Sequence, residues 1–365
     1  MLTTGWKWDR DGETFLRRQA DLPSSVGVYL AAQKDGWQCE RQSHDFLHDV
    51  RRVTRERGQT FIGYDNFHWG DDTVHRIGDI QDFPLGIGAK LRRWQALGAD
   101  GVFDHWGNAP GDLWCNSIAL RDFFLDPTAD ADATTRRIAH RQFGTAAGEH
   151  ALAAWTSIER AHVALSDACL WSPQQWPAWY AGRKAWPLPG HDFGPASLAQ
   201  SRQPPRRWGE RILNPANFTE ALRTVGDAWA AAVPHWAEAV KHLESAIAAA
   251  DESPLGYAHW WNGDTTPPTR RGHLQRQHRH AVAMLAAGRE IGRHFALHAL
   301  WEDAGHDAAV YRQSAAQVLA EDVAACRAAA ETFTALDAPA GWPAAYVAKA
   351  DAIEEFLKSG DSEAR

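Results

Sequence analysis

The stretch "GVFDHWGNAPGDLWCNS", residues 101–117, joins a short apolar run to a dense group of polar and aromatic side chains. Its first four residues have the pattern of a buried β-strand, and a histidine, two tryptophans and two asparagines follow within the next thirteen. In parallel α/β folds the ligand lies outside the carboxyl ends of the strands. The stretch therefore predicts one wall of a polar, aromatic-lined pocket.

The sequence before this stretch alternates short strand-like runs with amphipathic helices. Residues 1–6, 25–32 and 60–66 are predicted strands, and residues 43–58 form a predicted helix that ends at Gly58. A second helix has Leu91, Trp94 and Leu97 on one face and turns through Gly98 into the strand at 101–104. Strand–helix–strand units of this length predict parallel strands joined by right-handed crossovers.

After about residue 126 the pattern becomes helical throughout. One long helix is predicted from residue 217, with a kink at Pro234, and further helices near 269–301, 306–335 and 343–358. A proline- and tryptophan-rich excursion at 171–216 interrupts them, and we expect it to pack against the protein. The predicted fold class is therefore α/β plus all-α. A partial (β/α) barrel of about four parallel strands occupies 1–126, and an all-α domain occupies 127–365.

Composition excludes several classes of protein. The 365 residues carry a formal net charge of −8 with scattered arginines, which argues against nucleic-acid binding. There is no run of about 18 apolar residues and no signal-peptide pattern at the start, so no membrane association is predicted. The four cysteines are widely spaced, which indicates reduced thiols in a cytoplasmic protein.

No metal or other cofactor is predicted. His44 and His48 lie one helical turn apart, as do His294 and His298, but the glutamate of the HExxH zinc motif is missing between the first two. Solvated helix faces explain both pairs more simply.

Three consecutive predicted strand ends are followed by an aspartate and a tryptophan. Repetition at the same edge of a parallel sheet indicates one shared site rather than three unrelated loops. The predicted catalytic residues are Asp104 and Asp65. The predicted substrate-binding residues are Trp69, Trp106, His105, Asn66, His68, Tyr64, Asp35 and Trp37.

Paired carboxylates beside aromatic rings suit glycoside chemistry. One carboxyl group protonates the leaving oxygen, while the other attacks the sugar or activates water. A flat tryptophan ring can cover the apolar face of a pyranose. The alternative is that Asp65 and Asp104 are helix caps or structural ion-pair partners.

Three segments carry a resemblance to a known group of enzymes. They are "TFIGYDNFHWGDD" at 60–72, "PLGIGAKLRRWQALGADGVFDHWG" at 84–107 and "NSIALRDFFLDPTADADATTRRIAHRQFG" at 116–144. Together they resemble the last barrel strands and the first helices of bacterial glycoside hydrolases of the hexosaminidase and α-glucuronidase-like type. The resemblance implies a TIM barrel with a helical C-terminal domain, a carbohydrate substrate, and Asp65, Asp104, Trp69 and Trp106 as pocket residues without assigned roles.

The function predicted from these observations is glycoside hydrolysis without a metal. Two alternatives remain: a non-catalytic carbohydrate-binding or interaction protein, and a helical scaffold whose half-barrel is vestigial. A closed barrel needs eight strands, and about four are predicted here. We therefore expect either that a second copy of the chain or a separate half-barrel completes the sheet, or that the helical domain covers an edge of the sheet and leaves a stable, inactive remnant. In both cases we expect little turnover by this polypeptide alone.

Overall fold

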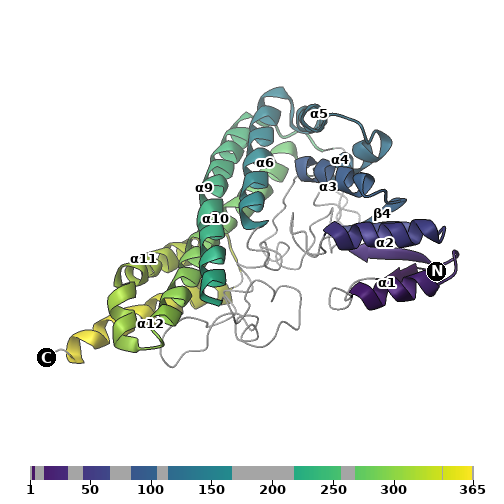
Figure 1. The fold of residues 1–365 in the computed structure, drawn as a ribbon. Helices are drawn as coiled ribbons and strands as arrows, with labels where there is room; N and C mark the ends of the chain where they lie inside the picture. The colour runs from purple at the N-terminus through teal and green to yellow at the C-terminus, as the bar shows by residue number, and fades with distance from the viewer. Residues whose placement is uncertain are drawn as a thin grey trace. The chain divides into compact units, whose positions relative to one another are not determined.

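The computed structural model describes residues 2–4, 12–31, 44–65, 84–104, 114–166, 218–255, 268–338 and 340–363 (Figure 1). The strands in these ranges are β1 (Leu2–Thr4), β2 (Gly27–Ala31), β3 (Phe61–Asp65) and β4 (Gly101–Asp104). The helices among and just after the strands are α1 (Gly12–Asp21), α2 (His44–Glu56), α3 (Pro84–Ala96) and α4 (Trp114–Leu125). The remaining described helices are α5 (Ala131–Phe143), α6 (Thr145–Ser166), α9 (Phe218–Ala249), α10 (Arg270–Asp303), α11 (Ala308–Ala335) and α12 (Gly341–Glu363).

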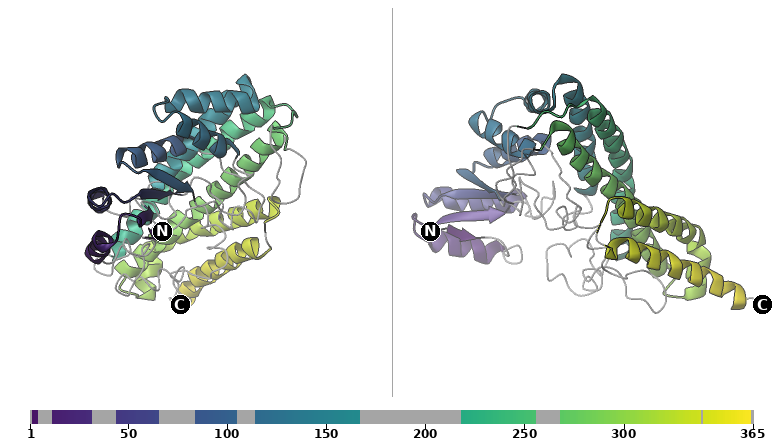
Figure 2. Two further views of the ribbon diagram at one scale, coloured as in Figure 1. Left: turned by 90° about the vertical axis from the view of Figure 1, so that its right-hand side faces the viewer. Right: turned by 180° about the vertical axis from the view of Figure 1, so that it is seen from behind.

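The four strands form one parallel sheet in the order β1-β2-β3-β4. Helices α1, α2 and α3 are the crossovers between successive strands. Right-handed crossovers that always step to the next strand place their helices on one face of the sheet. Helices α1 and α2 accordingly pack side by side (Figure 2). The α/β character with parallel strands is thus confirmed, as is the helical character of the later sequence.

Trp94 of α3 fixes the helix to the sheet. Its side chain is fully buried and makes an edge-on ring contact with Phe61 of β3, with centroids 6.0 Å apart. Gly63, the next residue on the same face of β3, leaves the space that the indole ring fills. Gly58 and Gly98, which end the turns after α2 and α3, have φ of +63° and +72°, a region that favours glycine.

Replacing Gly63 by alanine should destabilise the protein by about 1–3 kcal/mol, because the new methyl group would overlap the Trp94 ring. A Cβ atom at this position would lie 2.7 Å from Cε2 of Trp94. Urea unfolding measures the change, and Gly305→Ala is a comparison in open space, although its positive φ adds backbone strain. A Gly63→Ala protein as stable as the wild type would show that Trp94 does not fix α3 on the sheet.

The later helices are ordered by local caps and by an apolar core. Asp307 caps α11 by accepting hydrogen bonds from the backbone N–H groups of Ala309 and Val310, each at 2.9 Å. Helices α11 and α12 lie side by side (Figure 1). One core cluster joins α10, α11 and α12 through Leu297, Trp301, Tyr311, Ala315, Leu319 and Ile353. Helices α9 and α10 approach closely where Gly226 meets Gly292, since neither residue has a side chain.

The chain divides into two compact units that interleave along the sequence. Unit 1 comprises Met1–Gly70, Gln81–Glu159 and Ser245–His273. Unit 2 comprises Asp71–Ile80, Arg160–Glu244 and Leu274–Arg365. The domain boundary near residue 126 stays a prediction. Pro234 lies inside α9, and the excursion at 171–216 lies outside the described residues.

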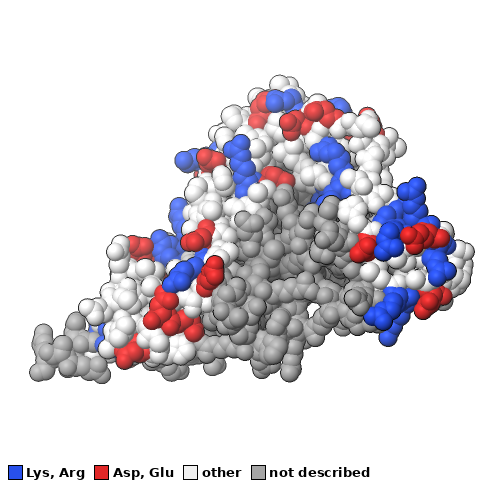
Figure 3. All heavy atoms as spheres, in the orientation of Figure 1, with Lys and Arg blue, Asp and Glu red and all other residues white. Residues whose placement is uncertain are grey.

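The described surface mixes both signs of charge. Acidic and basic side chains are interspersed over the described residues on the face in Figure 3. No helix in the described part of the chain is long and apolar enough to cross a lipid bilayer. Cys115 and Cys326 are buried free thiols.

Candidate functional site

The carboxyl ends of β3 and β4 bring the two predicted catalytic residues together. Asp65 is the last residue of β3, Asp104 is the last residue of β4, and the two are direct partners in the parallel register. Tyr64 pairs with Phe103 one step earlier. Neighbouring strands lie about 4.8 Å apart, so the backbones of the two aspartates are adjacent.

The other predicted site residues lie outside the described residues. They are Asp35, Trp37, Asn66, His68, Trp69, His105 and Trp106. For Tyr64, Asp65 and Asp104 the structure gives the position of the backbone at the edge of the sheet. The roles of all ten residues remain predictions.

Another aspartate, Asp100 at the amino end of β4, has a structural role. Asp100 precedes β4, and its Oδ2 accepts a 2.9 Å hydrogen bond from the backbone N–H of Phe61. Arg51 of α2 donates to both carboxylate oxygens of Asp100, at 3.2 and 3.4 Å. Asp100 therefore holds α2, β3 and β4 together, and it makes a matched control for Asp104.

A cavity of about 190 Å³ lies beside Asp100, between α3, β4 and α4. Its walls include Trp94, Val102, Phe123 and Phe124, and Arg92 lies over the Phe123 ring, with its Cζ 6.0 Å from the ring centroid. The carboxylate on its wall is that of Asp100, which is already bonded. The cavity is thus an apolar space without the paired acids that glycoside cleavage needs.

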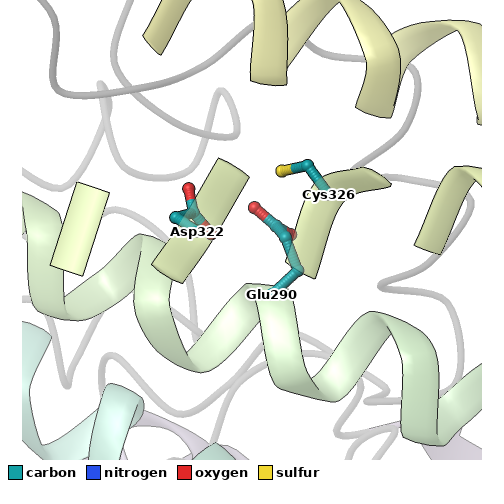
Figure 4. Close-up of side chains that lie close together, drawn as sticks. All are labelled: Glu290, Asp322 and Cys326. Carbon is teal, nitrogen blue, oxygen red and sulfur yellow. The ribbon is translucent and has the colours of Figure 1, made fainter. Parts of the chain in front are cut away.

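A buried group of charges in unit 2 was not predicted from the sequence. Lys349 of α12 is bonded to Glu290 of α10, and its Nζ lies 2.8 Å from Oδ2 of Asp322 on α11. All three side chains are almost completely buried. Cys326 lies beside Glu290 and Asp322 (Figure 4). We call these four residues the Lys349 cluster. One signal was available, because Leu319, Asp322 and Cys326 share the apolar spacing of α11.

The donor atoms of Glu290, Asp322 and Cys326 lie within 4.8 Å of one another, as metal ligands can. Lys349 supplies the positive charge at this place, and its bonds to both carboxylates raise its pKa despite burial. Burial raises the pKa of the Cys326 thiol well above its usual value, which disfavours the thiolate that binds metals. The geometry therefore supports a structural ion cluster that joins α10, α11 and α12.

The prediction of a solvated face for His294 and His298 is wrong. Both rings are buried, and they pack edge to face with centroids 4.6 Å apart. His280, about four helical turns before His294 on α10, is buried too and makes an edge-on contact with Trp236 of α9. Burial lowers the pKa of His280 to about 3, and burial also lowers that of His294 well below its usual value. The rings of His280 and His294 are therefore neutral core residues.

Comparisons with known proteins bear on the fold. No protein-family model matches the sequence, and no curated protein matches it significantly. Among solved structures, the chain is similar to a GH138 enzyme targeting pectin rhamnogalacturonan II, with a TM-score of 0.57 and 8% sequence identity. At 8% identity this likeness shows a shared fold alone. The similarity covers 99% of this chain and 56% of that chain, so this chain spans little more than half of that structure.

Proposed function

We propose that this chain is a glycoside hydrolase-like protein that binds a carbohydrate at the carboxyl edge of its sheet and cleaves a glycosidic bond there. The observation that carries the proposal is the pairing of Asp65 with Asp104 at the ends of adjacent parallel strands. Two motifs far apart in the sequence thus supply two acids to the edge where α/β enzymes bind their ligands.

In this mechanism one aspartic acid protonates the leaving oxygen and the other is the carboxylate that attacks the sugar. Retaining glycosidases hold these two groups about 5 Å apart, whereas inverting enzymes need about 6.5–9.5 Å. The stereochemistry of the product therefore reports which separation the two carboxyl groups have. Trp37, Trp69 and Trp106 are the proposed stacking surfaces for the sugar rings.

The proposed architecture is half of a (β/α) barrel followed by a helical domain from about residue 127. The strand order has no reversal, which fits a barrel and not a doubly wound sheet. The resemblance of residues 60–144 to hexosaminidase and α-glucuronidase-like hydrolases supports the same architecture. Further strands, from a second copy of the chain or from another polypeptide, would complete the barrel.

A second candidate function is carbohydrate binding without turnover. It is favoured by the number of strands, because the described residues contain four where a closed barrel has eight. In that case the same edge of the sheet holds the sugar, but a group needed for cleavage comes from elsewhere.

Replacing Asp104 by asparagine should reduce turnover by about 10²- to 10⁴-fold, the usual contribution of a general acid or base. The assay uses aryl glycosides and pectic oligosaccharides, the latter because the structural neighbour targets pectin. It is run with this chain alone and with a chain extended at its N-terminus. Asp100→Asn is the matched control, since Asp100 lies at the other end of β4 and serves the fold.

Equal turnover by Asp104→Asn and the wild type would remove Asp104 from the mechanism. Sugar binding without turnover in either chain would favour the second candidate. If the chain neither binds nor cleaves any of these sugars, the proposed function is rejected altogether.

A further inference from the structure

Helix α4 extends the helix layer of unit 1 beyond the described sheet. Trp94 of α3 packs over Gly63 of β3, so α3 covers the last strands of the sheet. Helix α4 packs beside α3 (Figure 1), while β4 is the last described strand in the sheet order. The helix layer is therefore one position wider than the described sheet.

The cavity of about 190 Å³ lies at this extra position, between α3, β4 and α4. Its lining includes Gly101 and Val102 of β4 and Phe123 and Phe124 of α4. Gly101 and Val102 are only partly buried, and β3 is the one described strand that pairs with β4. The free edge of a strand can pair with a further strand. A strand added beside β4 would direct every second side chain into the cavity, because Val102 lines it and paired residues share a face.

The end of α4 offers a contact surface beside this cavity. Phe124 and Leu125 are large apolar residues that are 49% and 79% exposed. The turn that follows carries three exposed aspartates, Asp126, Asp130 and Asp132. An apolar pair beside an acidic turn complements a helix that carries apolar and basic side chains together.

Helix α1 carries such side chains at the opposite side of the sheet. It follows β1, the first strand of the sheet order, and has Leu16 half-buried and Arg17 and Arg18 exposed. Helices α1 and α4 each follow a parallel strand, so both begin at the carboxyl edge of the sheet. The basic end of α1 and the acidic turn after α4 therefore lie at the same level of the sheet.

A second copy of the chain supplies the matching strand and helix together. All four strands are parallel, so β1 of one copy can pair with β4 of another in the same direction as the pairs within each copy. Two copies contribute eight strands, the number in a closed (β/α) barrel, and closure pairs both free edges of each copy. The complementary charges lie at the two edges that closure joins, which favours a second copy over an unrelated polypeptide.

We propose that two copies of this chain associate edge to edge, with β1 and α1 of each copy packed against β4 and α4 of the other. The added strand occupies the cavity beneath α4, and α1 covers the apolar end of α4. This assignment of the partner rests on the proposed function for its catalytic meaning, because the closed barrel completes the proposed sugar site. The association itself rests on the two edges of the described sheet.

Analytical ultracentrifugation over a range of protein concentrations tests the association. The wild type should sediment with about twice the 40.5 kDa mass of one chain. Leu125→Asp should weaken the dimer by about tenfold or more, because it buries an unpaired charge in the contact. Val310→Asp is the matched control, since Val310 is an exposed apolar residue on α11 of unit 2.

Cross-linking locates the contact. The photoreactive residue benzoylphenylalanine replaces Leu125, and ¹⁵N-labelled and unlabelled chains are mixed and irradiated. Mass spectrometry should then find peptides of α1 from one copy joined to position 125 of the other.

A monomeric wild type would overturn the inference, as would cross-links between copies that join position 125 to other surfaces. Equal weakening of the dimer by Leu125→Asp and Val310→Asp would also overturn it. A dimer joined through α1 that turns over no sugar would support the inference and defeat the proposed hydrolysis. Turnover by a monomeric chain would do the reverse.

Discussion

Replacing Lys349 by methionine should lower the free energy of unfolding by about 3–5 kcal/mol, the usual effect of removing one partner from a buried ion pair. The change leaves the carboxyl groups of Glu290 and Asp322 buried without their shared cation. Burial already raises the pKa of Asp322, so an ionised carboxylate there depends strongly on the lysine. Three helices meet at this cluster, and all three should loosen together.

Guanidinium unfolding of unit 2, followed by circular dichroism, measures this loss. Lys358→Met is the matched control, because Lys358 lies on the same helix in a solvent-exposed pair with Glu354 at 3.8 Å. Such exposed pairs contribute less than about 1 kcal/mol. Equal stability of the two variants would show that the Lys349 cluster does not hold α10, α11 and α12 together.

Acid should destabilise the chain through its buried histidines, and His280 gives the clearest case. Its pKa is lowered to about 3 in the folded protein, against about 6.5 in the unfolded chain. Between these values the unfolded state binds a proton that the folded state does not, so stability falls as the pH falls. The slope is about 1.4 kcal/mol per pH unit, which amounts to about 2.7 kcal/mol at pH 4.5.

His280→Phe isolates this effect from other groups. The raised pKa of Asp322 acts in the opposite direction, because the folded state then binds a proton before the unfolded state does. Both proteins contain Asp322, so the difference between them reports on His280 alone. Stability curves from pH 7.5 to 4.5 should diverge below about pH 6.5, with the variant less sensitive to acid. Parallel curves would mean that His280 titrates normally.

Much of the fold follows from local sequence patterns. The apolar runs at 27–31, 61–65 and 101–104 are strands, and the turns at Gly58 and Gly98 end helices as predicted. The covered face of α3 was less predictable. Leu91, Trp94 and Leu97 were the expected buried stripe, but Ile87 and Lys90 are buried as well. A helical period indicates one apolar face, but it does not indicate how much of the helix surface the neighbouring elements will bury.

The sequence predicted which types of residue lie at the candidate site, but not which residues of β3 and β4 lie opposite each other. The motifs after β3 and β4 indicated acids at one edge of the sheet, while the direct pairing of Asp65 with Asp104 depends on strand register, which no local pattern fixes. The buried His294, Glu290 and Asp322 were missed because polar residues on a helix usually face water. Only the packing of other helices shows that they do not.

Labelling with photoreactive oligosaccharides tests the central claim most directly, because it locates bound sugar whether or not the chain turns it over. After irradiation, mass spectrometry identifies the modified peptides. We expect adducts on the peptides that contain Asp65 and Asp104 and on the segments that follow them, 66–83 and 105–113, with competition by the unmodified sugar. Adducts confined to other parts of the chain, such as the segment 51–60 or helices α11 and α12, would contradict a sugar site at the carboxyl edge of the sheet.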